Sequence, residues 1–531
     1  MRASDLLIKS ILNSGINRVF SLSGNQIMPI FDSVVDLDME IIHCRHEASA
    51  VFMADGYAQS SGNTGIALVT AAPGFTNSLG PLYAIKANQS PVLLLSGDSP
   101  LSQNGLMSFQ ELNQTKISKE LVKKSWRIED ANLIGNDIAE AISLTKKGRP
   151  GPVHIALPFD ILNEKIVTVT SQNTKKSGPN IITIESEKLQ AIEKLLFKSQ
   201  KPLIITGPSL SESRNKDFYK QLYSSTKIPI ITMSSPRGSN DPSLGKLKLA
   251  LKESDLLIFI DKDIDFTLGF GSKERIPSDN IIYISCNDAS INHAKEMLKD
   301  RALININAEP KSAIASISKL KHNQNYESWL NHVKNLLASR PNKPITKNDK
   351  IKPYDLCKLV VNEVENNSDA IYISDGGEFG QWAQSIIPKS KIITNGPSGA
   401  IGGATPQAIG ASFANPDSII VCFMGDGTAG FQIAEWETAR RHNLPIIYII
   451  GNDQRWGAEV EIQIRDYGKD RAQYCMLDNL TRYDQIAEGM GCQGHFIQSI
   501  DQLKKVINEA ILSKKTTIID IQMDGLPAPS F

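Results

Sequence analysis

Two acidic residues each follow a short apolar run in the last third of the chain. Asp426 lies in Gly-Asp-Gly, directly after the apolar run 418–424, and Asp453 comes soon after the apolar run 446–450. Short runs rich in β-branched residues are typical of buried strands. A helical stretch, about 432–443, separates them, so the unit is predicted to be strand, turn, helix, strand. Both carboxylates are therefore expected at the carboxyl ends of neighbouring parallel strands, where ligands bind in open α/β sheets.

Carboxylates beside a helix N-terminus suit a diphosphate that is bound together with a hard divalent cation. The free N–H groups of the helix start bind the anion, and carboxylate oxygens are ligands that Mg²⁺ prefers. An ordinary turn followed by a strand-end cap explains Gly-Asp-Gly equally simply, and for the motif alone that interpretation is the stronger one. It is the whole arrangement that favours a diphosphate and a metal.

The stretch 425–457 resembles the metal–diphosphate motif of thiamine diphosphate (ThDP) enzymes, in which Gly-Asp-Gly precedes a pair of Asn-like residues at a fixed distance. The resemblance implies that Asp426, Asp453 and the backbone carbonyl of Arg455 hold Mg²⁺. Asp453 stands where the family usually has Asn, which adds a negative charge near the diphosphate. Further cofactor contacts implied here are Gly425, Gly427, Thr428, Ala429 and Trp456.

Glu47, in the segment Arg-His-Glu, resembles the glutamate that contacts the aminopyrimidine ring in these enzymes. A carboxylic acid bonded to N1′ favours the imino form of the cofactor, whose own 4′-imine then removes the C2 proton. We expect an apolar pocket that raises the pKa of Glu47. As an isolated residue, Glu47 would be an ordinary acid in the first turn of a helix.

Three uncharged polar residues are the other catalytic candidates. Gln110, in Phe-Gln-Glu, resembles a segment of acetolactate synthases, and an amide can bond a carbonyl oxygen or an alkoxide without titrating. Asn25 and Gln26 occupy the turn after the first strand, where benzaldehyde lyase-like enzymes carry His and acetolactate synthases a Gly-rich turn. Proton transfer at this corner must differ from that of the His-bearing enzymes, or run through water.

Glycine-rich turns supply the remaining candidates. The resemblance assigns cofactor contacts to Pro73, Gly74, Asn77, Gly376, Gly377 and Ile401. In the family, the residue at the position of Ile401 holds the two cofactor rings in a V, and a β-branched side chain is a stiff wedge. Helix N-cap turns would explain the glycine-rich sequences by themselves, and the two interpretations are compatible.

Strand-like runs alternate with helical patterns in three successive blocks, which predicts parallel sheets covered by helices on both faces. We expect an α/β protein of three doubly wound domains: residues 1–169, 184–338 and 355–531. Polar stretches at 170–183 and 340–354 are predicted linkers. The first block looks like the pyrimidine-binding domain of the acetolactate synthase group and the third like its diphosphate-binding domain. The central block matches by position.

Composition excludes several classes of partner. The 57 Lys and Arg balance 57 Asp and Glu, which favours neither nucleic acid nor an anionic membrane. The six cysteines form no CxxC and have no zinc spacing, and no apolar run approaches the ~20 residues that span a bilayer. The N-terminal helix lacks the apolar core of a signal peptide, so a cytoplasmic location is expected. His495 is expected in a turn.

The central block argues against FAD. FAD-binding relatives carry an Arg-containing segment after a strand, whereas the corresponding stretch 261–272 carries acids instead. Their charge would oppose a dinucleotide diphosphate, and likewise an ADP-bearing ligand such as coenzyme A.

The leading hypothesis is an acetolactate-synthase-like enzyme that decarboxylates a 2-oxo acid and joins the enamine to a carbonyl acceptor. The alternatives are a 2-hydroxy ketone or 2-hydroxyacyl-CoA lyase, a simple 2-oxo acid decarboxylase, and a ThDP-binding protein without catalysis, against which Glu47 argues. The resemblance implies a homodimer or a dimer of dimers. The sequence does not name the acceptor, because loops of several domains would surround it.

Overall fold

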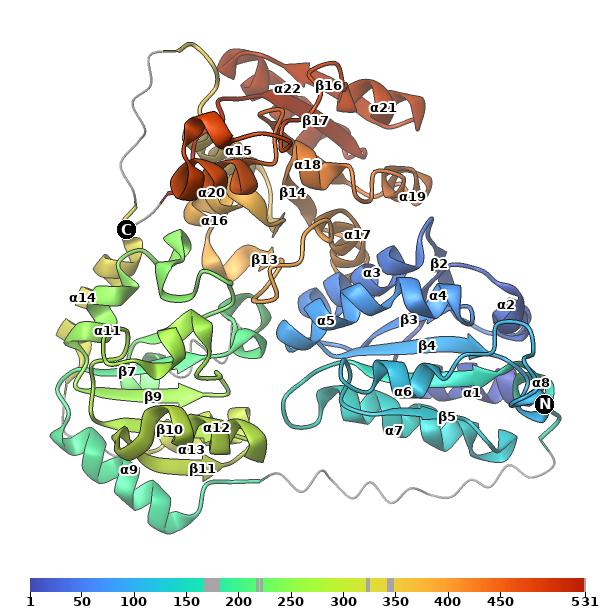
Figure 1. Ribbon diagram of the computed structural model, residues 1–531, viewed down its shortest axis with the longest axis horizontal. Coiled ribbons are helices and arrows are strands. Elements are labelled where there is room, and N and C mark those ends of the chain that lie inside the picture. The colour runs from blue at the N-terminus through green and yellow to red at the C-terminus, as the bar shows by residue number, and fades with distance from the viewer. Residues whose placement is uncertain (167–181, 216–218, 220–222, 321–324, 341–347, 530–531) are drawn as a thin grey trace.

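The computed structural model contains three parallel sheets, each flanked by helices. The predicted α/β class with three parallel sheets is confirmed. The parts of the chain around these sheets are the N-terminal, central and C-terminal domains (Figure 1). The structure describes residues 1–166, 182–215, 219, 223–320, 325–340 and 348–529. The predicted linker 170–183 lies almost wholly outside these ranges, and so do residues 341–347 of the predicted linker 340–354.

The N-terminal sheet has the strand order β2-β1-β3-β4-β6-β5. Its strands are β1 (Arg18–Ser21), β2 (Glu40–His43), β3 (Gly65–Val69), β4 (Val92–Asp98), β5 (Ser125–Arg127) and β6 (Val153–Pro158). Its helices are α1 (Ala3–Asn13), α2 (Met28–Val35), α3 (Glu47–Ser61), α4 (Pro73–Asn77), α5 (Leu79–Ala87), α6 (Gln114–Ser118), α7 (Ile134–Lys146) and α8 (Phe159–Asn163).

The central sheet has the order β11-β10-β9-β7-β8. Its strands are β7 (Pro202–Thr206), β8 (Ile230–Thr232), β9 (Leu256–Ile260), β10 (Ile281–Ser285) and β11 (Ala302–Asn307). The helices around it are α9 (Ser186–Lys198), α11 (Leu247–Glu253), α12 (Asp288–Leu298), α13 (Pro310–Ile317) and α14 (Glu327–Ala338).

The C-terminal sheet has the order β13-β12-β14-β15-β17-β16. Its strands are β12 (Ala370–Ser374), β13 (Ile392–Thr394), β14 (Ile419–Gly425), β15 (Ile446–Asn452), β16 (Gln493–Ile497) and β17 (Thr517–Gln522). Its helices are α15 (Pro353–Asn367), α16 (Gly377–Ile386), α17 (Ala404–Ala414), α18 (Asp426–Ala429), α19 (Glu435–Arg441), α20 (Gly457–Tyr467), α21 (Tyr483–Gly489) and α22 (Ile500–Ser513).

The N- and C-terminal sheets therefore share one strand order, and equivalent helices, α3 and α17, pack against each other between them (Figure 1). The contact is reciprocal. A Cβ on Gly56 would lie 2.1 Å from the Gln407 carbonyl oxygen, and a Cβ on Gly410 would lie 1.9 Å from that of Met53. Only glycine allows this approach of two backbones. The offset from 53 to 407 equals that from 56 to 410, and it also relates Glu47 to Ile401.

One apolar core runs through this junction. Buried side chains from β3, α3, α17, β14 and β15 form a single cluster that includes Phe75 and the fully buried Trp436. The N- and C-terminal domains are thus joined by a shared core, and the beginnings of α3 and α17 have fixed relative positions.

Three short strands were not expected from the sequence: β5, β11 and β16. All three lie at sheet edges, and their side chains are mostly half-buried. An edge strand exposed on one side does not need the continuous apolar run by which the inner strands were predicted. His495 consequently lies in β16, and its expected position in a turn was wrong.

The helix predicted at about 432–443 is shorter in the structure. A four-residue helix, α18, begins at Asp426, and α19 covers only Glu435–Arg441. Asn443 has a φ of +52°, a left-handed conformation that stops a helix.

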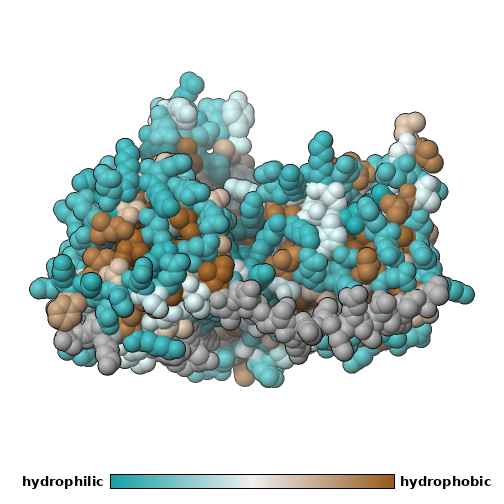
Figure 2. Space-filling view, turned by 90° about the horizontal axis from the view of Figure 1, so that it is seen from below, coloured by the Kyte–Doolittle hydropathy of each residue, from teal (hydrophilic) through white to brown (hydrophobic). Residues whose placement is uncertain are grey.

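The lower surface, where the central and N-terminal domains lie side by side, is covered mostly by hydrophilic side chains with small apolar patches between them (Figure 2). No helix in the described ranges is long and apolar enough to span a bilayer.

Candidate active site

Asp426 and Asp453 lie together at the carboxyl edge of the C-terminal sheet. Strands β14 and β15 are parallel neighbours in register, with Gly425 opposite Gly451, and each carboxylate follows the end of its strand. Their predicted placement is confirmed. Burial, together with the neighbouring Asp453 carboxylate, raises the pKa of Asp426 to about 7, and burial also raises the pKa of Asp453. Two buried carboxylates side by side favour a bound cation, since a cation stabilises their charged forms.

The positively charged Arg455 side chain partly compensates the negative charge of Asp453. Its Nε donates to Asp453 Oδ2 over 2.9 Å, and Nη1 lies 3.2 Å from Glu461 Oε1. A Cβ on Gly525 would lie 2.5 Å from Nε, so this glycine makes room for the guanidinium. Sequence reasoning did not predict the ion pair between Arg455 and Asp453. The acid two positions before it was the available signal for an ion pair.

A cavity of about 190 Å³ lies beside the two carboxylates. It is lined by Gly376, Gly377, Ile401, Gly425, Asp426, Gly427, Thr428, Asp453, Arg455, Trp456 and Gly457, among others. A Cβ on Gly377 or Gly425 would meet nothing within 4 Å, so both glycines border open space. Gly427 instead supports the Trp456 ring, whose nearest atom would lie 2.9 Å from a Cβ there. The cavity therefore brings together most of the predicted C-terminal site residues; Ala429 does not line it and is buried in the apolar core.

Asp375 holds the two glycine-rich turns of this cavity together. Its carboxylate accepts hydrogen bonds from the backbone N–H groups of Gly376, Gly402 and Ala404. Burial raises the pKa of Asp375 to about 6. Because Gly376 precedes α16 and Gly402 follows Ile401, this one side chain sets the distance between the turn at Gly376 and the predicted wedge residue.

In the described ranges, no group of three or more His, Cys, Asp and Glu side chains could hold a metal ion. Asp426 and Asp453 can provide two oxygen ligands, and a hard cation takes six or more. The remaining ligands would have to come from backbone carbonyls, water and an anionic ligand in the cavity.

At the N-terminal site, Glu47, Gly74 and Asn77 come together as predicted. Glu47 is the first residue of α3, and its Oε2 accepts a hydrogen bond of 3.0 Å from Asn77 Nδ2 at the end of α4. A Cβ on Gly74 would lie 3.5 Å from Glu47 Oε1. Pro73 begins α4 and is exposed. Glu47 is only half-buried in the single chain, so the expected apolar pocket is not closed by these residues alone.

The two catalytic candidates in the turn after β1, Asn25 and Gln26, differ in burial. Gln26 is buried, and its Oε1 accepts a hydrogen bond of 3.0 Å from Thr70 Oγ1, whereas Asn25 is exposed. Thr70 also packs beneath the turn of Gly74, since a Cβ there would lie 2.8 Å from its Cγ2. Thr70 thus connects Gln26 to the Glu47 site, a positioning role that sequence reasoning missed.

Gln110 lies in the mostly exposed loop before α6, and among the described residues no hydrogen bond joins it to Glu47 or Asp426. Its φ is +61°, and its Oε1 is buried without a hydrogen-bond partner among the described residues. The neighbouring Met107 and Phe109 side chains are 94% and 72% exposed. Glu111 fixes the loop by accepting hydrogen bonds from the Gly105 and Ser108 N–H groups.

In the central domain, the acids at 261–265 form ion pairs. Arg149, from the N-terminal domain, donates to Asp261 over 2.9 Å and to both oxygens of Asp263 over 2.8 and 3.1 Å. Lys262 pairs with Asp265 at 2.8 Å. This segment therefore ties the central domain to the N-terminal domain.

Both polar sites fall inside matches to protein-family models. Residues 1–117 match the N-terminal TPP binding domain of thiamine pyrophosphate enzymes, and residues 375–521 match the C-terminal TPP binding domain of the same enzymes. The chain belongs to the thiamine diphosphate enzymes. The family predicted from the sequence motifs is confirmed.

Curated relatives cover the whole chain. It is 26% identical to the acetolactate synthase large subunit of Pyropia yezoensis, over 97% of this chain and 91% of the relative. It is 26% identical to that of Buchnera aphidicola, over 99% and 95%, and 24% identical to the isozyme 2 large subunit of Escherichia coli, over 99% and 96%. The protein is an acetolactate-synthase-like ThDP enzyme.

Proposed function

We propose that this enzyme uses ThDP and Mg²⁺ to decarboxylate a 2-oxo acid and to join the remaining acyl unit to a carbonyl acceptor. The observation that carries the proposal is the pair of buried carboxylates, Asp426 and Asp453, beside a glycine-lined cavity. Relatives with the name acetolactate synthase support the direction of the reaction.

The C-terminal site fits a diphosphate with a cation. Asp426, Asp453 and the Arg455 carbonyl would hold Mg²⁺, and the N–H groups at the start of α16 and around Gly425 to Ala429 would bind the phosphate oxygens. Arg455 leaves Asp453 with a smaller net charge than a free carboxylate would have, so the change from Asn to Asp is compatible with an anionic ligand. ThDP, when bound, supplies the nucleophilic carbon and the electron sink for decarboxylation.

The N-terminal site would control one proton. Glu47 would hold the proton at the pyrimidine ring, and the Asn77 amide would orient its carboxyl group by the hydrogen bond to Oε2. Gln110, Gln26 and Asn25 would offer uncharged donors to the oxygen of the substrate or acceptor, with no change of their own protonation state.

The same residues would serve a lyase of 2-hydroxy ketones or 2-hydroxyacyl-CoA, or a simple decarboxylase. Ligation is favoured because the relatives that match over nearly their full length are acetolactate synthases. A ThDP-binding protein without catalysis is disfavoured, because Glu47 is present and is held by Asn77.

Two chains would complete each site. The loop before Gln110 exposes Leu106, Met107 and Phe109, and the C-terminal domain exposes Tyr474 and Leu480. Exposed apolar side chains gathered on loops mark interaction surfaces. A second copy that covers these loops would close the half-buried Glu47 site and give the Gln110 amide its partner.

A substrate panel tests the reaction. Purified enzyme with ThDP and Mg²⁺ is supplied with 2-oxo acids, alone and with aldehydes, and separately with 2-hydroxy ketones; products are read by mass spectrometry. We expect a carbon–carbon ligation product that requires both cofactors. Aldehyde as the sole product would indicate a decarboxylase, and cleavage of the hydroxy ketones without ligation would indicate a lyase.

We also propose that the enzyme works without flavin. One guanidinium, Arg149, pairs with both Asp261 and Asp263, which leaves a net negative charge that would oppose a dinucleotide diphosphate. The purified enzyme should be colourless, and added FAD should not change its rate. Stoichiometric flavin in the preparation would overturn this part of the proposal.

A further inference from the structure

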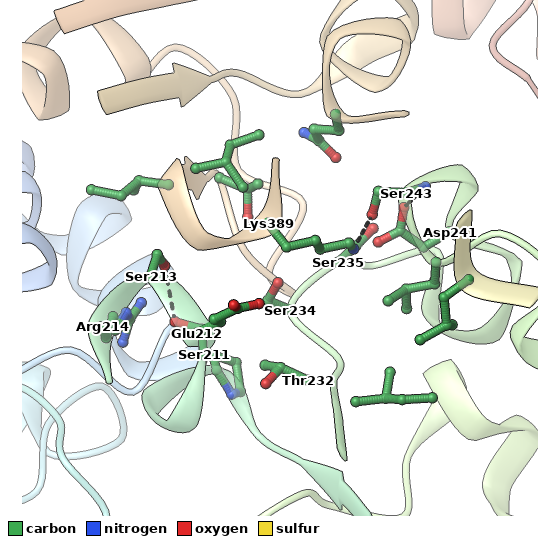
Figure 3. A pocket seen from close by; sticks show the side chains of 18 of the residues that line it. Ser211, Glu212, Ser213, Arg214, Thr232, Ser234, Ser235, Asp241, Ser243 and Lys389 are labelled. Carbon is green, nitrogen blue, oxygen red and sulfur yellow. Dashed lines mark hydrogen bonds between the residues drawn. The ribbon is translucent and has the colours of Figure 1, made fainter. Parts of the chain in front are cut away.

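A second cavity, of about 290 Å³, lies at the junction of the three domains and shares no lining residue with the cavity beside Asp426. The N-terminal domain contributes Gln59 and Asn88, the central domain the segments around Arg214, Thr232 and Ser243 and the end of α14, and the C-terminal domain the stretch from Gln384 to Gly396. Figure 3 shows that Lys389 reaches across this cavity toward Ser235 and Ser243, with Arg214 and Glu212 on another wall.

Three cations in the walls have only neutral hydrogen-bond partners in the described part of the chain. The Lys389 ammonium donates to Ser243 Oγ over 2.6 Å. Arg214 donates to the carbonyl oxygens of Asn88 and Gln89 and to Gln59 Oε1. Arg340 donates to the carbonyl oxygens of Leu337 and Ser339. Burial lowers the pKa of Lys389 and of Arg340, and lowers that of Arg214 to about 10.

The acids near the cavity are fewer than its cations, although the charge of the buried Asp55 also acts on Arg214 from outside the cavity. Asp241 and Glu212 line it, and the Asp241 carboxylate accepts a hydrogen bond from the Ser243 N–H group. A fourth cation, Lys334, lies over the Tyr223 ring. The cavity is also lined by the hydroxyl-bearing residues Thr232, Ser234 and Ser235. Lys389 is half-buried in this wall, and its pKa stays lowered although Asp241 and Glu212 attract its charge. A bound anion would therefore stabilise the charged form of Lys389.

We propose that this cavity binds a small molecule that carries an oxyanion group, a phosphate or a carboxylate. The Lys389 ammonium and the Ser243 hydroxyl hold the oxyanion, since charge-assisted hydrogen bonds to such oxygens are the strong ones. Arg340 supplies a second positive charge, and the hydroxyl-bearing wall accommodates a polar body. The volume limits the ligand to a small metabolite, because larger ligands occupy larger pockets.

The test uses enzyme loaded with ThDP and Mg²⁺, so that the cavity beside Asp426 is already filled. Inorganic phosphate and succinate are titrated separately by calorimetry, with ionic strength held constant by chloride. We expect saturable binding of at least one. Lys389→Met should weaken this binding by about tenfold or more, because a charge-assisted hydrogen bond is lost. Lys389→Arg should restore much of it.

Lys391→Met is the matched control. Lys391 lies two residues further along, outside the cavity, and pairs with Glu365 and Asp369. The Lys391→Met variant should bind phosphate or succinate with an affinity within about twofold of that of the natural chain, because ion pairs near the surface contribute little. Ser243→Ala is the second variant and should weaken binding several-fold. Phosphate binding alone would assign a phosphate site, and succinate binding alone a carboxylate site. Binding of neither ion, or equal affinity in Lys389→Met and Lys391→Met, would overturn the proposal.

Discussion

The N- and C-terminal domains have the same strand order and meet through equivalent helices, yet the carboxyl edges of their sheets carry different chemistry. The N-terminal site has the Glu47 carboxylate, held by the Asn77 amide. The C-terminal site has Asp426 and Asp453 side by side, with Arg455 beside the second, while Asp375 at the same edge is engaged by backbone N–H groups. One fold therefore provides two kinds of site, and the side chains at the strand ends determine which.

This difference predicts that the N-terminal site mainly affects the rate of reaction and the C-terminal site mainly affects cofactor affinity. A single carboxyl group that exchanges a proton contributes to rate and little to affinity, whereas paired carboxylates that hold a cation contribute mainly to affinity. Substitutions in the two domains should consequently affect different measured quantities.

The largest effect is expected for Glu47→Gln. The kcat should fall by about a thousandfold, since loss of an acid–base group costs factors of this order, while ThDP affinity measured by calorimetry stays within a few-fold. The control is Glu40→Gln, an exposed acid at the beginning of β2 that pairs with Arg18. Near-normal turnover in Glu47→Gln would remove Glu47 from the chemistry.

The next effect is expected in the C-terminal domain. Asp426→Ala should weaken the binding of ThDP with Mg²⁺ by about a hundredfold, because one of few protein ligands is lost. Asp417→Ala is the matched control, since Asp417 is exposed near the opposite, amino end of β14. If calorimetry finds unchanged ThDP binding in Asp426→Ala, the cofactor is held elsewhere.

A smaller effect should distinguish Asp453 from the Asn that is usual in the family. Asp453→Asn should still bind ThDP with Mg²⁺. Arg455→Gln should weaken binding by about tenfold in the natural chain but by about twofold or less in the Asp453→Asn background, because the charge that it compensates is gone. Equal effects of Arg455→Gln in both backgrounds would show that the guanidinium acts independently of Asp453.

The smallest effect concerns stability and pH. His154, fully buried in β6 among serine hydroxyls, has its pKa lowered by burial to about 3, so its neutral form is favoured in the folded state. Its contribution is therefore present above pH 6.5 and is lost as the pH falls toward 3. Asp520, in the equivalent strand β17, has its pKa raised by burial to about 6, so its contribution is present below pH 3.8 and is lost as the pH rises toward 6.

These two groups oppose each other between about pH 4 and 6, by at most about 1.4 kcal/mol per pH unit each. Thermal melts without ThDP should show the difference. Relative to the natural chain, His154→Gln should gain stability as the pH falls through this range, and Asp520→Asn should lose it. Parallel pH profiles for the two variants would contradict the assigned burial of both groups.

The sequence predicted the elements that have a regular pattern of apolar residues. The inner strands appear as apolar runs, so β14 and β15 were found, and with them the positions of Asp426 and Asp453. Edge strands such as β11 are half-exposed, with a weaker apolar pattern, and were missed. The end of α19 was misplaced because the left-handed Asn443 leaves no signal in apolar spacing.

Contacts between side chains distant in the sequence were not predictable. Nothing in the spacing of Arg149 and Asp263 shows that they form an ion pair between two domains. The reciprocal packing of Gly56 and Gly410 depends on the approach of two helices, and the role of Thr70 depends on which turn it supports. The motifs predicted which residues form the sites, and the fold determined which of them meet.

Glu47→Gln mixed with Asp426→Ala, at a ThDP concentration too low to load Asp426→Ala alone, tests whether two chains share one cofactor. We propose that the N-terminal domain of one chain and the C-terminal domain of another hold the two ends of one cofactor. After subunit exchange, verified by mass labels on one variant, each mixed dimer would contain one intact site. Random pairing should then restore about a quarter of the natural activity. No recovery despite proven exchange would show that Glu47 and Asp426 act within one chain, and would contradict the account.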